Sequence, residues 1–213
     1  EVENELVDLP GVEEWYWGEE RVVYTNNHQA SWIIQGDLAV YSSRYLNEGF
    51  CSTKKASHQI DFELPGIVSG PQSSRLEVRF LSTHSPLHEV TVNLNGSDAF
   101  TESFSGQQML SSVVELNSDQ LAEDNLLSLS GGPTSGEYWI GGVDILYPRG
   151  FEFEGQSFAA LSLPTAPGSR FLNLRELANN GEEAVLYDLK NHWRLRAQLE
   201  DSAFPFHLPA SDG

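Results

Sequence analysis

The chain contains a single cysteine, Cys51, and this is the only residue that could act as a thiol nucleophile. A catalytic thiolate needs a nearby histidine and a group that orients that histidine. Lys54 and Lys55 follow Cys51 closely and would lower the pKa of the thiol. Nothing else in the segment Gly49-Phe-Cys-Ser-Thr is typical of a catalytic loop. We therefore expect Cys51 to be structural, and one cysteine excludes an internal disulfide.

His84 and His88 have the spacing of a metal-binding pair on a helix. Pro86 lies between them and excludes a helix there. A zinc site also needs further ligands, and none has a recognisable spacing relative to this pair. The sequence therefore predicts no metal at these histidines.

Three acidic residues, Asp119, Glu123 and Asp124, crowd a short turn. The loops of β-sandwiches bind calcium through such carboxylates, but the spacing of a calcium-binding helix–loop–helix motif is missing. We expect a solvated acidic loop and no cofactor, and structural calcium is the alternative.

Asp61 and Glu63 are two residues apart and so share one face of a strand. The two carboxylates of a glycosidase must flank a bond from opposite sides, so we expect this pair to be solvated. Nucleophile elbows, phosphate-binding loops and dinucleotide fingerprints are all missing from the sequence. No catalytic residue is predicted.

Aromatic residues near the start of the chain could bind carbohydrate. Trp15, Trp17 and Trp32 are the candidate ligand-binding residues, because exposed indole rings stack on sugar rings. Strand alternation would send Trp15 and Trp17 to the same face. Since the core of a sandwich needs large aromatic residues, packing in the core is the favoured interpretation.

The elements that must position these residues show alternation with a period of two, which is typical of β-strands. Pro65-Gly66, Asn95-Gly96 and Gly131-Gly132-Pro133 separate such segments, and Asn-Gly is a strong hairpin signal. Helical stretches of normal length are missing, so we predict an all-β fold, an antiparallel jelly-roll-like sandwich. The expected strands cover residues 14–17, 31–34, 58–64, 75–81, 88–94, 99–104, 113–116, 125–130 and 138–147.

Two short segments could form helical turns. In the first, residues 117–124, Ser118 could cap one turn of 3₁₀ helix. The second, residues 174–179, is too short to form a stable helix alone.

The sequence Pro148-Arg149-Gly150 interrupts the pattern. Proline cannot continue a strand ladder and glycine permits a sharp bend, so we expect the strand before it to end here. Alternation resumes with Phe151-Glu-Phe-Glu154 as a half-buried strand. We therefore expect two parts: a sandwich over residues 1–149, and a smaller β extension over residues 150–213 that packs on the sandwich or leads to a following domain.

The formal net charge is −19, from 31 acidic and 12 basic residues. Such a surface repels phosphate backbones and anionic membrane surfaces, which excludes nucleic acid as a partner. No apolar run approaches the roughly 18 residues that span a bilayer, so no membrane insertion is expected. The excess of carboxylates fits either a saline habitat or an ordinary acidic secreted protein.

Five segments of the sequence occur in an order that resembles a known family. They are HEVTVNLNG, FTESFSGQQ, DQLAEDNLLSLS, GGVDILYPRGFEFEGQSFAA and EEAVLYDLKNHWRLRAQL. This order, over roughly residues 74–199, resembles the non-catalytic β region upstream of the catalytic domain in gingipain-like cysteine peptidases, which are secreted or surface-bound proteins associated with type IX secretion. The matched motifs are His88–Gly96, Phe104–Gly106, Leu121–Leu127, Asp144–Arg149 and Tyr187-Asp188. The chain departs from the family after Asp188, where a proline-containing turn is replaced by Lys190-Asn-His-Trp193.

The resemblance implies that the catalytic cysteine and histidine lie beyond Gly213, so no catalytic residue is transferred to this chain. It also implies a secreted or cell-surface, outer-membrane-associated protein. We therefore expect a non-catalytic accessory module whose partners are neighbouring domains of the same polypeptide, in particular a peptidase domain. The alternative is a carbohydrate-binding sandwich, an adhesin or targeting module with a glycan or a cell-surface protein as its partner.

Overall fold

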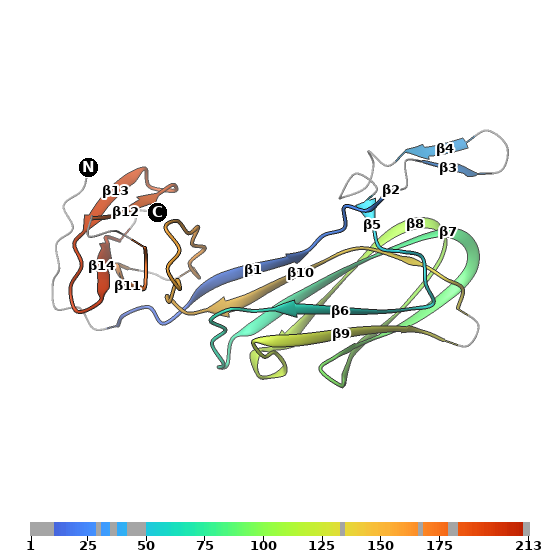
Figure 1. Cartoon of the computed structure of the whole chain (residues 1–213), viewed down its shortest axis with the longest axis horizontal. Coiled ribbons are helices and arrows are strands. Elements are labelled where there is room, and N and C mark those ends of the chain that lie inside the picture. Colours follow the sequence, from blue (N-terminus) through green and yellow to red (C-terminus); the bar gives the residue numbers. More distant parts are fainter. Residues whose placement is uncertain are drawn as a thin grey trace. The chain divides into compact units, whose positions relative to one another are not determined.

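The computed structural model describes residues 11–28, 31–34, 38–41, 50–132, 135–165, 168–178 and 183–210. These residues form an all-β structure of antiparallel sheets, which confirms the predicted fold class (Figure 1). The strands are β1 (Tyr16–Val22), β2 (Asn27–His28), β3 (Ser31–Ile34), β4 (Leu38–Tyr41), β5 (Phe50–Cys51), β6 (Ser57–Glu63), β7 (Ser73–Leu94), β8 (Ser97–Asn117), β9 (Asp124–Gly131), β10 (Trp139–Arg149), β11 (Arg170–Arg175), β12 (Ala184–Asp188), β13 (Trp193–Ala197) and β14 (Ala203–Leu208).

The chain divides into two compact units, Glu19–Tyr147 and Glu1–Gly18 with Pro148–Gly213. Each unit has a hydrophobic core of its own. The division that we expect from the sequence, after Arg149, remains a proposal about how the protein is built from domains.

The first unit is a β-sandwich built around one long hairpin. Its six-stranded sheet has the order β1-β10-β7-β9-β6, and β8 pairs with β7. The first half of β7 pairs with β10 and the second half with β9, so the curved hairpin β7–β8 passes through both layers (Figure 1). One layer therefore contains β1 and β10, and the other contains β9 and β6.

Apolar side chains at every second position of these strands fill the space between the two layers. On β7, Leu76, Val78 and Phe80 face the core from one layer, and Val90 and Val92 face it from the other; each is fully buried or nearly so. Burial of this apolar surface stabilises the sandwich by roughly 25 cal/mol per Å². Because apolar residues recur at every second position, these strands could be predicted from the sequence.

The turn of the long hairpin is the predicted Asn95-Gly96. Both residues have positive φ angles, 52° and 87°, as a two-residue hairpin turn of this hand requires. The sequence predicted two strands on each side of this turn, and the structure joins each pair into one long strand. Pro86 and Gly106 interrupt the alternation in the joining residues, 82–87 and 105–112, so alternation alone did not reveal the continuity.

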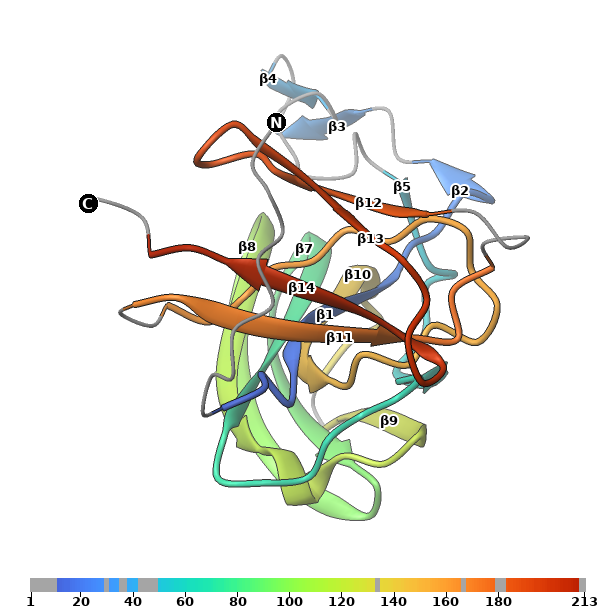
Figure 2. The ribbon, with the colours of Figure 1, turned by 90° about the vertical axis from the view of Figure 1, so that its left-hand side faces the viewer.

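The second unit contains two antiparallel two-stranded sheets, β11–β14 and β12–β13 (Figure 2). Its core includes Tyr16, Phe151, Phe153, Phe204 and Phe206. Side chains from β11, β13 and β14 therefore pack with three aromatic residues from outside these sheets, Tyr16, Phe151 and Phe153.

The prediction of a strand over residues 151–154 is wrong in part. Phe151 and Phe153 are buried and Glu152 is exposed, as alternation predicted, but only Glu152 forms an isolated bridge, with Arg175. Positive φ angles at Glu154 and Gly155 bend the chain and end the extended conformation.

The prediction that the preceding strand ends at Pro148 is also wrong, because β10 continues to Arg149. A proline at the end of a strand removes only a terminal ladder hydrogen bond.

The predicted single turn of 3₁₀ helix is confirmed as η3 (Ser118–Gln120), but Ser118 does not cap it. Asn117 precedes the turn, and its backbone NH donates to Oε1 of Gln120 at 2.9 Å. The hydroxyl of Ser118 donates instead to the carbonyl of Gln72 at 2.6 Å. Residues 174–178 form no helix, since β11 extends to Arg175 and Glu176 has a positive φ.

Candidate functional site

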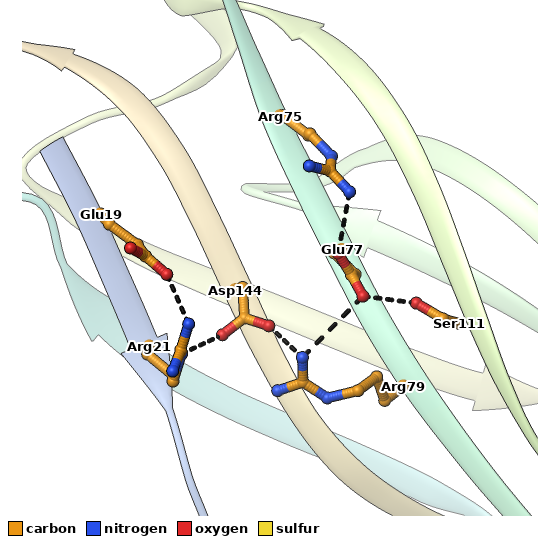
Figure 3. Close-up of polar contacts among 7 residues, drawn as sticks. All are labelled: Glu19, Arg21, Arg75, Glu77, Arg79, Ser111 and Asp144. Carbon is orange, nitrogen blue, oxygen red and sulfur yellow. Dashed lines mark hydrogen bonds and ion pairs between the residues drawn. The ribbon is translucent and has the colours of Figure 1, made fainter. Parts of the chain in front are cut away.

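A network of charged side chains lies on the outer face of the layer that contains β1, β10, β7 and β8 (Figure 3). At its centre Arg79 donates from Nη1 to Oδ2 of Asp144, and these side chains are only 5% and 16% exposed. The other oxygen of Asp144 accepts from Nε of Arg21 at 2.6 Å. Nη2 of Arg21 in turn contacts Glu19 at 2.6 Å. Three strands, β7, β10 and β1, are therefore linked through one carboxylate.

Glu77 extends the network along β7. Its Oε2 accepts from Arg75 at 3.0 Å, and its Oε1 accepts from the hydroxyl of Ser111 on β8 at 2.5 Å. The same Oε1 lies 3.9 Å from Nη1 of Arg79. Glu77 thus connects β7 to its hairpin partner on the side away from β10.

The charged groups of this network bind one another. The hydrogen bond to Asp144, with the attraction of that carboxylate and of Glu19, raises the pKa of Arg21. Among the described residues, Nε and Nη2 of buried Arg79 have no hydrogen-bond partner. A shallow hollow of about 320 Å³ lies beside the network, lined in part by Glu19, Arg21 and Arg75. Because each carboxylate binds an arginine or a hydroxyl of the protein, the arrangement joins strands and assembles no acid–base pair.

Of this network, only Asp144 could be singled out from the sequence, as a member of a motif. A signal was present: Arg75, Glu77 and Arg79 alternate with apolar residues on one strand, and Asp144 interrupts an apolar run. The sequence does not indicate that the strands of these residues, β7 and β10, are neighbours in the sheet.

A second hollow, of about 840 Å³, lies where β1 and β6 end the two layers. Asp61 and Glu63 both line it and both are exposed, as predicted. The hollow also contains Glu20 and Asp124, so carboxylates dominate its charged groups.

The acidic turn of Asp119, Glu123 and Asp124, which we expect to be a solvated loop, is held by an asparagine clamp. Nδ2 of Asn95 donates to the carbonyl of Gln120 at 3.1 Å and to Oδ1 of Asn125 at 2.9 Å. Asn125 also pairs with both backbone groups of Ala122. Within the described ranges no three His, Cys, Asp or Glu side chains come together as a metal site. The solvated loop stays a prediction, with structural calcium as its alternative.

Cys51 is fully buried and packs with Leu81, Trp139 and Met109. Burial raises the pKa of its thiol to about 11, opposite to the lowering that Lys54 and Lys55 would have caused. Lys54 instead lies over the ring of Trp139 at 5.0 Å. The prediction of a structural cysteine is confirmed by this position.

His88 is also buried. Its Nε2 lies 2.9 Å from the hydroxyl of Ser82 and its Nδ1 lies 3.3 Å from the carbonyl of Gly136. The side chain of His84 falls outside the described residues. His88 therefore acts as a polar anchor inside the core.

Trp15 and Trp17 lie on one face, as predicted, and form an edge-to-face pair with ring centroids 4.8 Å apart. Tyr16, between them, is the residue that enters the core, and both indoles remain half-buried. Trp15 and Trp17 therefore lie at the margin of the core, and the choice between packing and carbohydrate binding stays a prediction for them. Trp32 lies on β3, and its side chain is outside the described residues.

No protein family model and no curated protein sequence matches the chain. Solved structures do resemble it. Dimeric latent PorU from Porphyromonas gingivalis is similar over 93% of this chain and 19% of its own, with 12% identity and a TM-score of 0.62. This chain therefore spans about a fifth of the PorU chain, and the likeness supports a PorU-like β-rich region.

Carbohydrate-binding modules show a weaker likeness. The CBM36-1 domain of a multidomain xylanase from the hindgut metagenome of Trinervitermes trinervoides is 13% identical, with 60% of this chain and 96% of that domain covered and a TM-score of 0.38. A family 35 module from Clostridium thermocellum is 13% identical, with coverages of 62% and 95% and a TM-score of 0.34.

No helix in the described ranges has the length and apolar character needed to cross a membrane.

Proposed function

We propose that this chain is a non-catalytic accessory module of a secreted or cell-surface, gingipain-like multidomain protein. It packs against a neighbouring peptidase domain and positions it. The observation that carries the proposal is the likeness to latent PorU, which covers 93% of this chain and so includes residues of both units. The order of the five sequence motifs supports the same position in a longer polypeptide.

The residues of these motifs support a structural function. Asn95 and Asn125 clamp the hairpin turn, Asp144 joins three strands, and the hydroxyl of Tyr147 donates to the carbonyl of Pro65 at 3.2 Å. In β12 the carboxylate of Asp188 accepts from the backbone NH groups of residues 190 and 191. In four of the five motifs these contacts thus fix a strand or a turn.

The test joins this chain to the polypeptide that adjoins it in its gene. The thermal stability and peptidase activity of the joined protein are compared with those of the adjoining domain alone. We expect the midpoint of thermal unfolding of the adjoining domain to rise when the module is present. Peptide cleavage by this chain alone, lost on Cys51→Ala, would contradict the proposal.

Carbohydrate binding is the second candidate, and the half-buried pair of Trp15 and Trp17 favours it. Indole rings that reach solvent stack on sugar rings, although an edge-to-face pair presents less flat surface than a coplanar platform. A glycan array, read with and without calcium, tests this candidate. Binding that is lost on Trp15→Ala with Trp17→Ala would support it, and an array without signal would exclude it.

A further inference from the structure

The two strands that end the path β1-β10-β7-β9-β6 each have one edge without a partner strand in the described part of the chain. Strand β1 pairs with β10 alone over its sandwich portion, and β6 pairs with β9 alone. β1 and β6 are the two ends of this order, and β7 is its middle strand. An unpaired edge presents backbone NH and carbonyl groups that another strand can bind.

The hollow of about 840 Å³ lies between these edges, since residues 20–23 of the β1 segment and residues 61–63 of β6 both line it. Its lining also includes apolar side chains: Val22 is half-buried, Val23 is 56% exposed, and Leu126 is 37% exposed. The space between the edges therefore has both the volume and the apolar surface that a short extended segment would occupy.

The backbone of β6 supplies hydrogen-bonding groups on this side. The NH of Leu64 donates to the carbonyl of Glu123, on the β9 side of the strand, at 2.7 Å. Because backbone groups alternate between the two sides of an antiparallel strand, those of Asp61 and Glu63 face the hollow. The side chains of Asp61 and Glu63 are exposed, so the same two residues also present carboxylates.

The charge of the residues that line the hollow determines which kind of strand could bind there. Glu20, Asp61, Glu63 and Asp124 line the hollow, with Arg21 as the single cation among its lining residues. A second copy of this chain, with net charge −19, would be repelled. We propose that an extended polypeptide segment with alternating basic and apolar residues adds as a strand between β1 and β6. Its amides pair with the free edges, its cations meet the carboxylates of Asp61 and Glu63 on one face, and its apolar side chains cover Val22 on the other.

The proposal is tested with a labelled octapeptide of alternating lysine and valine, by fluorescence anisotropy and by hydrogen–deuterium exchange. We expect saturable binding and slower exchange at the amides of residues 61 and 63. An octapeptide of alternating glutamate and valine is expected not to bind. A lysine–valine octapeptide with every second amide N-methylated is expected to bind at least about tenfold more weakly, because it retains its charge but cannot form one edge of the ladder.

Variants of the chain separate this site from general attraction to an acidic protein. Asp61→Asn with Glu63→Gln is expected to weaken binding of the lysine–valine peptide. Glu115→Gln with Asp119→Asn removes the same charge from exposed residues outside the hollow and is expected to leave affinity unchanged. The proposal is overturned by a lack of saturable binding, by equal binding of the N-methylated peptide, or by equal weakening in both variants. This inference does not depend on the proposed function.

Discussion

Arg79 on β7 and Asp144 on β10 form an ion pair that is almost completely removed from solvent. In the register of the two strands Arg79 lies opposite Gly142 and Asp144 lies opposite Glu77, so the pair is diagonal. Asp144 is also the acidic residue of the motif that ends in Tyr-Pro-Arg. In this chain its carboxylate has two arginine partners, Arg79 and Arg21.

Removing one partner of this ion pair should be costly. Asp144→Ala leaves the guanidinium of Arg79 buried without its carboxylate, and breaking such a pair costs about 3–5 kcal/mol. We expect a decrease of that order in the free energy of unfolding, measured by urea denaturation. Arg75→Ala, which removes a 48% exposed partner of Glu77, is the control and should cost about 0–1 kcal/mol.

Replacing both partners should restore much of the loss. Arg79→Met with Asp144→Leu removes both buried charges and fills similar volume, a change that is often neutral. We expect this double variant to be more stable than Asp144→Ala. A double variant that is less stable than Asp144→Ala would show that the network contributes net stability beyond the strands it joins.

Stability should depend on pH through His58. Burial lowers the pKa of this histidine, against the opposing effect of its hydrogen bond to the carbonyl of Tyr138. The folded state therefore binds fewer protons than the unfolded state just below the ordinary pKa of about 6.5. The stability that neutral His58 contributes is complete above that pH and is lost as the pH falls.

The measurement compares the free energy of unfolding at about pH 8 and about pH 5.5 in the parent and in His58→Gln. The loss on acidification should be smaller in the variant, because glutamine does not titrate. Equal losses in the two proteins would show that His58 does not contribute to the pH dependence.

Cys51 should be unreactive in the folded protein. Its side chain is fully buried, and the pKa of about 11 leaves little thiolate at neutral pH. We expect a thiol reagent such as 5,5′-dithiobis(2-nitrobenzoate) to react only after urea is added. Rapid reaction of the native chain would mean that the thiol is accessible.

A side chain at the second residue of the hairpin turn should destabilise the fold through backbone strain. Gly96 has a φ of 87°, and alanine in this conformation is expected to cost about 1 kcal/mol. The control is Gly132→Ala, where an added Cβ would meet its nearest atom at an ordinary 3.6 Å. Thermal unfolding should distinguish the two, and equal midpoints would contradict the assignment of the turn.

Alternation was enough to predict the all-β fold, because residues such as Leu76, Val78 and Phe80 keep a strict period of two. It could not show that β7 and β8 each pass through both layers, since Pro86 and Gly106 interrupt the alternation in the joining segments. The Asn95-Gly96 turn was readable because it depends on local backbone conformation alone. By contrast, the network of Arg79 and Asp144 depends on which strands are neighbours.

The aromatic residues near the start of the chain show the same limit. Their shared face followed from alternation, but the choice of Tyr16 as the core residue depended on partners distant in sequence, Phe151 and Phe153. Likewise, nothing local indicated that the ends of β1 and β6 border one hollow. Pairing between distant strands is the information that a single sequence did not supply.

The central claim is that this chain works by packing against an adjoining domain. Hydrogen–deuterium exchange of the chain alone, compared with the same chain joined to the polypeptide that adjoins it in its gene, tests this most directly. The account predicts amides on a continuous surface of this chain that exchange more slowly only in the joined protein. Identical exchange of the chain in both forms would contradict it.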